Sequence, residues 1–140
     1  MLRSAPSAGA TYPLELYLVT PEYVVRYIPT GHRLEIVVRK DVREALTKAA
    51  LDQSWIATAP MVFIFVGELA RTAEKYGDRA LRYVHIEVGC ASENLLLQAA
   101  SLGWRGVPVG AYYDHDVAEI LVLPDGWHPY LIVPVGRPAE

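Results

Sequence analysis

The chain has 140 residues, of which 52% are hydrophobic and 21% are charged, and its formal net charge is −3. No concentrated basic run occurs, which argues against binding to nucleic-acid phosphates. No apolar stretch reaches the ~18–20 residues that span a bilayer, and the N-terminus lacks a signal-peptide pattern. The single Cys90 excludes an intrachain disulfide and a cysteine metal cluster. We therefore expect one intracellular, cytoplasmic domain over residues 1–140.

The first third of the chain predicts a loop followed by three strands. Residues 1–13 contain several Gly and Pro breakers and read as a loop. Residues 14–20 are apolar and β-prone, which indicates a buried strand. Residues 23–28 and 34–38 flank a turn-like stretch and predict a hairpin.

The next segment predicts a helix and a central strand. Asp41 with Glu44 three positions later forms a capping-box pattern, and apolar residues at helical spacing then predict a helix over 42–51. Residues 53–59 read as a short helical turn or loop. Six consecutive apolar residues at 61–66 predict a strand that is covered on both faces.

A long helix dominates the second half of the prediction. Residues 68–76 are expected to be helical, and Gly77 marks a break after which Asp78 is a candidate cap. The following helix is placed at about 79–102, with Gly103 as its C-cap. Its apolar positions cover most of its circumference, so we expect it to be buried in a core or in an interface.

The C-terminal part predicts two further strands and a short helix. Residues 107–112 read as a strand broken by Pro and Gly, Asp114 or Asp116 as the cap of a helix through Leu121, and residues 130–135 as the final strand. The sum is an α+β domain with a mostly antiparallel sheet of about five strands, flanked by helices and containing a long central helix. No linker or second domain is evident.

Four phrases could carry chemistry, although each also has a plain structural explanation. Small side chains at Pro6 to Ala10 would let a planar ligand approach the backbone, but such a phrase is usually a flexible terminus. The Pro and Gly of residues 107–111 ordinarily mark a bulge or a sheet edge. Lys75-Tyr76 reads as a helix end with a solvated lysine, and Gln53 as an exposed amide. The four histidines show no metal-ligand spacing, so no metal site is expected.

The order of these phrases resembles the nitroreductase superfamily, most closely its SagB-type dehydrogenase branch. The resemblance covers roughly residues 3–138. It implies a homodimeric, FMN-dependent oxidoreductase that holds the flavin at the dimer interface and moves two electrons as a hydride. Two substrate classes remain open: a small electrophile with NAD(P)H as electron donor, or a peptide-derived azoline ring that is dehydrogenated.

The resemblance also assigns roles to individual residues. Lys75 and Tyr76 match a pair implicated in proton abstraction beside the flavin. Gly110 matches the backbone N–H that points at the flavin N5. The other expected cofactor contacts are Arg3, Pro6, Ser7, Ala8, Gln53, Pro108, Val109 and Arg137. In the helix, Glu87 to Asn94 resembles a family phrase, with Glu93 where Gln is usual and Cys90 where His is frequent.

The chain departs from the family pattern at its ends. Relatives carry an N-terminal helical region with an Arg-Ser-x-Arg phrase that grips the FMN phosphate, whereas only Arg3 precedes the Pro-Ser phrase here. Losing most of these charge-assisted contacts would cost a few kcal/mol, or two to three decades in affinity. Candidate substitutes are Arg71, Arg79, Arg82 and Arg105. The alternative is a catalytically weak or flavin-free structural subunit that assembles with another chain.

Overall fold

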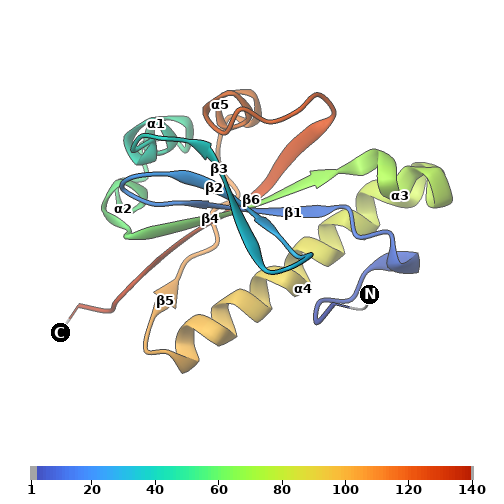
Figure 1. Ribbon diagram of the computed structural model, residues 1–140, viewed down its shortest axis with the longest axis horizontal. Coiled ribbons are helices and arrows are strands. Elements are labelled where there is room, and N and C mark those ends of the chain that lie inside the picture. The colour runs from blue at the N-terminus through green and yellow to red at the C-terminus, as the bar shows by residue number, and fades with distance from the viewer. Residues whose placement is uncertain (1–2, 140) are drawn as a thin grey trace.

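A six-stranded sheet in the order β3-β2-β1-β4-β6-β5 forms the centre of the protein (Figure 1). The computed structural model describes residues 3–139. Its strands are β1 Leu14–Val19, β2 Val24–Ile28, β3 Arg33–Val38, β4 Met61–Glu68, β5 Arg105–Gly106 and β6 Trp127–Gly136. Each neighbouring pair is antiparallel. The predicted α+β class is confirmed, and the sheet has six strands rather than about five, with β5 at its edge only two residues long.

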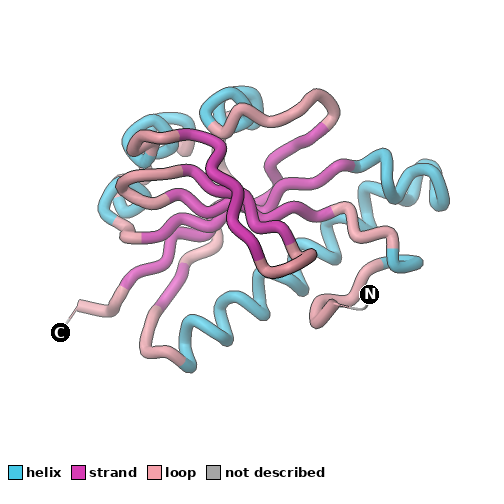
Figure 2. The backbone as a smooth tube through the Cα atoms, in the orientation of Figure 1, coloured by secondary structure: helices cyan, strands magenta, loops and turns pink. Residues whose placement is uncertain are grey.

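Helices cover both faces of this sheet (Figures 1 and 2). They are α1 Arg43–Ala49, α2 Trp55–Thr58, α3 Leu69–Tyr76, α4 Ala80–Ser101 and α5 Asp114–Ile120, with short 3₁₀ turns η1 Ala8–Ala10 and η2 Gly77–Arg79. The long helix α4 crosses one face, and α1, α2 and α5 pack on the other. Among residues 3–139, no helix is both long and apolar enough to cross a membrane.

The alternation of side chains along β4 divides the interior into two cores. Ile64 points toward α1, α2 and α5 and packs with Leu46, Ile56 and Ile132, all fully buried. Phe65 points the other way and packs with Val88 of α4. Successive residues of a strand face opposite sides, so a run of apolar residues feeds both cores. The predicted strand with two covered faces is therefore confirmed.

One side of α4 remains outside both cores. Val84 and Val88 are buried against the sheet, whereas Ile86 is 56% and Leu97 is 60% exposed. We define the outer face of α4 by its exposed residues at helical spacing, namely Ile86, Gly89, Glu93, Leu97 and Ala100. The expected burial of this helix in a core is met on its inner side, and the expected burial in an interface stays a prediction for its outer face.

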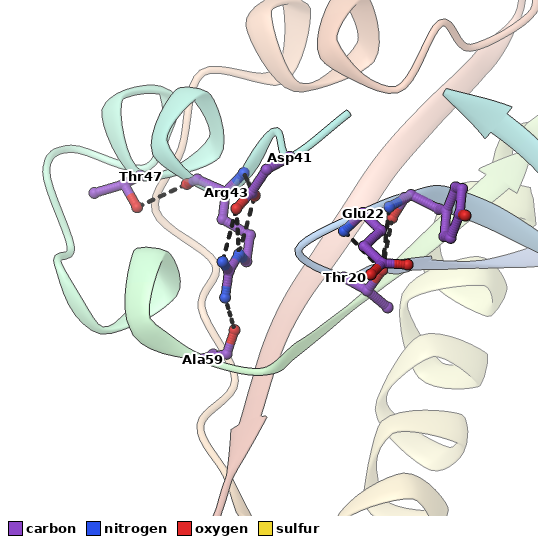
Figure 3. Close-up of polar contacts among 7 residues, drawn as sticks. Thr20, Glu22, Asp41, Arg43, Thr47 and Ala59 are labelled. Atoms are coloured by element: carbon purple, nitrogen blue, oxygen red, sulfur yellow. Dashed lines mark hydrogen bonds and ion pairs between the residues drawn. The ribbon is translucent and has the colours of Figure 1, made fainter. Parts of the chain in front are cut away.

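The predicted capping box at Asp41 and Glu44 is wrong. Val42 is the N-cap of α1 and makes no side-chain capping bond. Asp41 is instead engaged by Arg43, whose backbone N–H donates to Oδ1 at 3.0 Å and whose Nη2 lies 2.7 Å from Oδ2 (Figure 3). The hydrogen bonds from this guanidinium hold the pKa of Asp41 below its ordinary value. Arg43 therefore competes for the carboxylate of Asp41 that the predicted capping box requires.

Two other expected caps and one expected strand also differ from the structure. Asp78 lies within η2, and Tyr113 precedes α5 without any side-chain capping bond from an aspartate. Residues 107–112 form only an isolated bridge, between Val109 and Ile132. The N–H of Val107 donates to the carbonyl of Pro134, but Pro134 has no N–H to return. The ladder therefore cannot continue along this segment.

Candidate functional site

The small-residue loop at the N-terminus has a defined conformation. The hydroxyl of Ser7 accepts the N–H of Tyr12 at 2.9 Å, and the N–H of Ala10 donates to the carbonyl of Ser7 at 3.1 Å. The Thr11 hydroxyl lies 2.8 Å from that of Thr72 in α3. These bonds fold the loop onto α3, so it is not a free terminus.

Gly9 brings this loop against Lys75 and Tyr76. Its φ of +57° lies in the left-handed region that favours glycine. A Cβ at this position would lie 2.5 Å from Tyr76 Oη and 2.7 Å from Lys75 Nζ. Two phrases that are more than sixty positions apart therefore meet. A side chain here would displace the tips of Lys75 and Tyr76 and strain the left-handed backbone, so glycine leaves a backbone cradle beside the amine and the phenol.

Glu87 lies close to the same loop, and sequence reasoning gave it no role of its own. Its side chain is 5% exposed and lies on the inner side of α4. Burial raises the pKa of Glu87, while the nearby Ser7 hydroxyl and the charge of Arg3 act in the opposite direction. The sequence signal that could have revealed this residue is its place beside Val88, on the apolar side of the predicted helix, where a carboxylate is unusual. We call Arg3, Ser7, Gly9, Lys75, Tyr76 and Glu87 the N-terminal cluster.

A groove of about 900 Å³ opens beside this cluster. It runs between α4, β1 and the β2–β3 hairpin, and apolar side chains form most of its walls. Arg3 stacks over the ring of Tyr12 at 4.6 Å, on one side of the groove. Other lining residues are Leu16, Tyr27, Phe65, Glu87, Leu95 and Leu97.

Replacing Glu87 with Gln should stabilise the protein at alkaline pH and not at acidic pH. Because the folded-state pKa of Glu87 is raised, its stabilising contribution is complete below the unfolded pKa and is lost as pH rises through the folded value. The amide keeps the neutral form at every pH. Thermal melts of Glu87→Gln and wild type should coincide near pH ~4 and separate near pH ~8. Equal melting temperatures at both pH values would contradict the raised pKa.

Arg71 is unavailable as a free phosphate ligand. Its Nη1 lies 2.8 Å from Glu15 Oε1, and its Nε lies 2.6 Å from Glu68 Oε2. Nη1 also donates to the carbonyl of Tyr12 at 3.1 Å. Two carboxylates offset its charge, so Arg71 acts as a brace that joins β1, the start of α3 and the N-terminal loop.

The remaining predicted residues form a second group. Gln53 Nε2 donates to the carbonyl of Ala111 at 3.1 Å, so the glutamine holds the chain directly after Gly110. Arg105 is paired with Gly136, which places it next to Arg137 at the edge of the sheet. Gly110 is exposed, and a Cβ there would meet nothing within 4 Å. We call this the C-terminal cluster, defined by Gln53, Arg105, Pro108, Gly110 and Arg137.

Val109 fits a direct role at a ligand less well than its neighbours. Its side chain is 3% exposed and packs in the core. Its N–H donates to Ile132 at 2.7 Å, and its carbonyl accepts the N–H of Ile132 at 3.1 Å. Val109 therefore anchors the segment, while Pro108 and Gly110 on either side remain exposed.

The two clusters lie on opposite sides of the molecule. The N-terminal cluster adjoins α3, and the C-terminal cluster lies toward β5 and the C-terminus (Figure 1). Between α3 and β5 runs α4, whose 22 residues make a helix about 33 Å long. Within residues 3–139, no hydrogen bond or ion pair links one cluster to the other. The structure thus places the predicted site residues in two separate regions.

A match to the nitroreductase family model covers residues 2–137. A protein of Methanocaldococcus jannaschii assigned as a nitroreductase is 44% identical over 144 residues, which is 99% of this chain and 72% of that protein. This extent of similarity is well beyond what a shared fold alone requires. The matched region extends over nearly the whole chain.

Solved structures show the same fold. A protein of Anabaena variabilis assigned as a nitroreductase superposes with a TM-score of 0.93 at 26% identity, over 97% of this chain and 29% of that chain. The Escherichia coli microcin synthetase McbBCD complex gives 0.89 at 22% identity, over 100% and 57%. The NADPH:FMN oxidoreductase of Vibrio harveyi gives 0.73 at 21%, over 98% and 55%. This chain spans little more than half, or less, of these three structures, and by its sequence and α+β architecture it belongs to the nitroreductase family.

Proposed function

We propose that the protein is an FMN-dependent oxidoreductase of the SagB type, with each flavin held between two copies of the chain. This proposal depends mainly on the separation of the two clusters, since each cluster offers half of a site. The N-terminal cluster has a glycine cradle beside an amine and a phenol. The C-terminal cluster has an open glycine backbone and two arginines. Membership of a family whose members are typically FMN-dependent oxidoreductases supports the cofactor.

The outer face of α4 supports the pairing of two copies. Ile86 and Leu97 expose apolar area there, and a Cβ on Gly89 would meet nothing within 4 Å of its own chain. A glycine inside a helix costs roughly 1 kcal/mol relative to alanine, and close approach of another surface is a physical reason to keep it. Two copies packed antiparallel along α4, related by a two-fold axis, would bring the N-terminal cluster of one toward the C-terminal cluster of the other.

The residues fit a flat, phosphorylated ring system. Gly9 and Gly110 offer main-chain surface without side chains, and Arg105 with Arg137 would supply charge-assisted hydrogen bonds to a phosphate. Bound FMN would supply two-electron hydride chemistry. The N–H of Gly110 would donate to the ring nitrogen that takes up hydride, Lys75 would accept a substrate proton, and Tyr76 would hold or return a proton at its hydroxyl.

Two substrate classes fit this arrangement. One is an azoline ring in a modified peptide, from which Lys75 would accept a proton while bound FMN would supply the two-electron oxidation. The similarity to the microcin synthetase complex, whose structure contains truncated pro-MccB17, supports this class. The other is a small electrophile reduced with NAD(P)H as electron donor, supported by the likeness to a NADPH:FMN oxidoreductase solved with NAD⁺.

The direct test is the absorbance spectrum of the purified protein with and without added FMN. We expect bands near ~370 and ~450 nm that belong to bound oxidised flavin. Lys75→Ala should retain these bands and lower turnover by roughly 100-fold or more, the usual loss for a general base. Lys48→Ala, on the exposed side of α1, is the matched control and should behave as wild type.

A second candidate is a flavin-free structural subunit. It is favoured by the engagement of Arg71 with Glu15 and Glu68, which removes one cation from those that could hold a phosphate. A colourless protein that also fails to bind added FMN would support the structural subunit and contradict the FMN-dependent oxidoreductase. Unchanged turnover in Lys75→Ala would remove only the lysine from the mechanism.

A further inference from the structure

We propose that Thr72 is a positioning residue whose hydroxyl holds the N-terminal loop against Lys75 and Tyr76. The inference rests on the function proposed above, in which that pair moves protons. It adds a residue to which the resemblance gives no role. The contacts run from Thr72 in α3 to the loop, and from the loop back to the end of the same helix.

The first contact joins the hydroxyl of Thr72 to that of Thr11. Thr72 is the buried residue of α3, with only 1% of its surface exposed, and the two hydroxyl oxygens lie 2.8 Å apart. A hydroxyl has one proton to donate, and Thr11 donates its own to the carbonyl of Ala8 at 3.0 Å. Thr72 is therefore the donor in this pair. Because a buried donor without an acceptor costs free energy, Thr72 favours the loop position that presents Thr11 to it.

The loop needs such a hold because its backbone is strained. Ala10 has a φ of +54° and Tyr12 a φ of +46°, and this left-handed region is unfavourable for residues with side chains. Thr11 lies between them. Within residues 3–139, two hydrogen bonds join this loop to α3: the bond between Thr72 and Thr11, and the bond from Arg71 to the carbonyl of Tyr12 at 3.1 Å. The turn before Thr11 is therefore tied to α3 through Thr72.

That turn contains Gly9, which contacts the proposed proton-moving pair. A Cβ at Gly9 would lie 2.5 Å from Tyr76 Oη and 2.7 Å from Lys75 Nζ. Lys75 and Tyr76 follow Thr72 by three and four positions, so the three side chains share one side of α3. Among the described residues, no ion pair or side-chain hydrogen bond fixes the Lys75 amine or the Tyr76 hydroxyl. The loop that Thr72 holds is thus the neighbour that sets the position of both tips.

The test compares Thr72→Val, Thr72→Ser, Thr11→Val and the Thr72→Val/Thr11→Val double variant. Valine keeps the shape of threonine and removes the hydroxyl, whereas serine keeps the hydroxyl. NMR signals of the Lys75 amine and the Tyr76 ring are recorded in protein without substrate. We expect Thr72→Val to shift both signals and Thr72→Ser to leave them near wild type. In protein that already carries Thr11→Val, adding Thr72→Val should shift them no further.

Amide hydrogen exchange reports on the loop itself. The N–H groups of Ala10 and Thr11 close the turn through the carbonyls of Ser7 and Ala8. In Thr72→Val their exchange should become about fivefold faster, the factor expected for the loss of one ordinary hydrogen bond. The matched control is Thr47→Val in α1, which removes a hydroxyl that donates to the carbonyl of Arg43 at 2.9 Å. It should leave the loop exchange and both NMR signals unchanged.

Turnover supplies an independent readout. Thr72→Val should lower kcat by roughly 10- to 100-fold, as expected for a misplaced catalytic group, with little change in KM, and Thr72→Ser should retain most of the wild-type kcat. Unmoved Lys75 and Tyr76 signals in Thr72→Val, or a further shift in the double variant, would overturn the proposal. If Thr72→Val does not fold, Thr11→Val decides the question by the same signals, because it leaves α3 unaltered. If the protein binds no FMN, the proposed function fails, and the NMR comparison still decides whether Thr72 positions the pair.

Discussion

Gly110→Val should abolish FMN binding and leave the stability of the chain unchanged. A Cβ at Gly110 meets nothing within 4 Å, and its backbone is outside the left-handed region, so a valine fits the isolated protomer. The branched side chain would instead occupy the space in which the flavin lies on the backbone. We expect FMN affinity to fall by on the order of 100-fold or more, equivalent to about 2.7 kcal/mol. Fluorescence titration and thermal melts measure the two quantities.

Mixing the Gly110→Val protein with the Gly9→Val protein should restore part of the FMN binding. Valine at Gly9 would displace the tips of Lys75 and Tyr76 and strain a left-handed residue, so we expect this variant also to lose FMN. After mixing and exchange of subunits, half of the dimers carry both lesions on different chains. Each such dimer has one intact site, so about a quarter of all sites should bind FMN, given a two-fold symmetric dimer.

The Gly9→Val/Gly110→Val double variant is the control for this experiment. A heterodimer of the double variant with wild type has one lesion in each site and should bind no FMN. In a one-to-one mixture about a quarter of all sites should therefore bind FMN, whereas a site contained within one chain would give one half. No recovery on mixing the single variants, or half retention with the double variant, would contradict a site shared between chains.

The strands and helices were predictable wherever apolar periodicity alone decides the structure. The apolar run of residues 61–66 fills both cores and forms β4, and the long apolar pattern before Gly103 forms α4. The predicted ends of helices and strands were wrong where a neighbouring residue offered a competing interaction or lacked a hydrogen-bond donor. The guanidinium of Arg43 binds the carboxylate of Asp41, and α1 begins after Val42 rather than after Asp41. Pro134 in the neighbouring strand removes the donor that a strand at 107–112 requires.

The site was predictable as a set of residues and not as an arrangement. The resemblance named Lys75, Tyr76 and Gly110, but only the fold shows that Gly9 meets the first two and that Gly110 follows a residue bound to β6. Long-range contacts of this kind depend on how α3 and α4 follow β4. Glu87 was missed because its burial depends on tertiary packing that the pattern of one helix does not show.

Ile132→Ala should destabilise the protein by about 2–5 kcal/mol, the usual cost of a large-to-small change in a core. Ile132 is fully buried, lies opposite Ile64 in β4, and packs in the core beneath α1 and α5. Removing its side chain leaves a cavity among rigid neighbours. Chemical denaturation should show a lower midpoint with an unchanged slope.

The matched control is Ile36→Ala, at an edge-strand position that is 42% exposed. It should cost less than about 1 kcal/mol, because little apolar area is lost and no closed cavity forms. Equal losses in the two variants would contradict the division into a packed core and an open edge.

Bound FMN extends this comparison to the site. The backbone of Ile132 holds Val109 through two hydrogen bonds, and Val109 adjoins Gly110. FMN at 100 times its Kd should stabilise wild type by about 2.7 kcal/mol. Because the alanine variant keeps the backbone bonds, it should gain the same amount at 100 times its own Kd, and its Kd should stay within about twofold of wild type. A larger loss of affinity would mean that core packing under Val109, as well as the glycine backbone, shapes the surface on which the flavin lies.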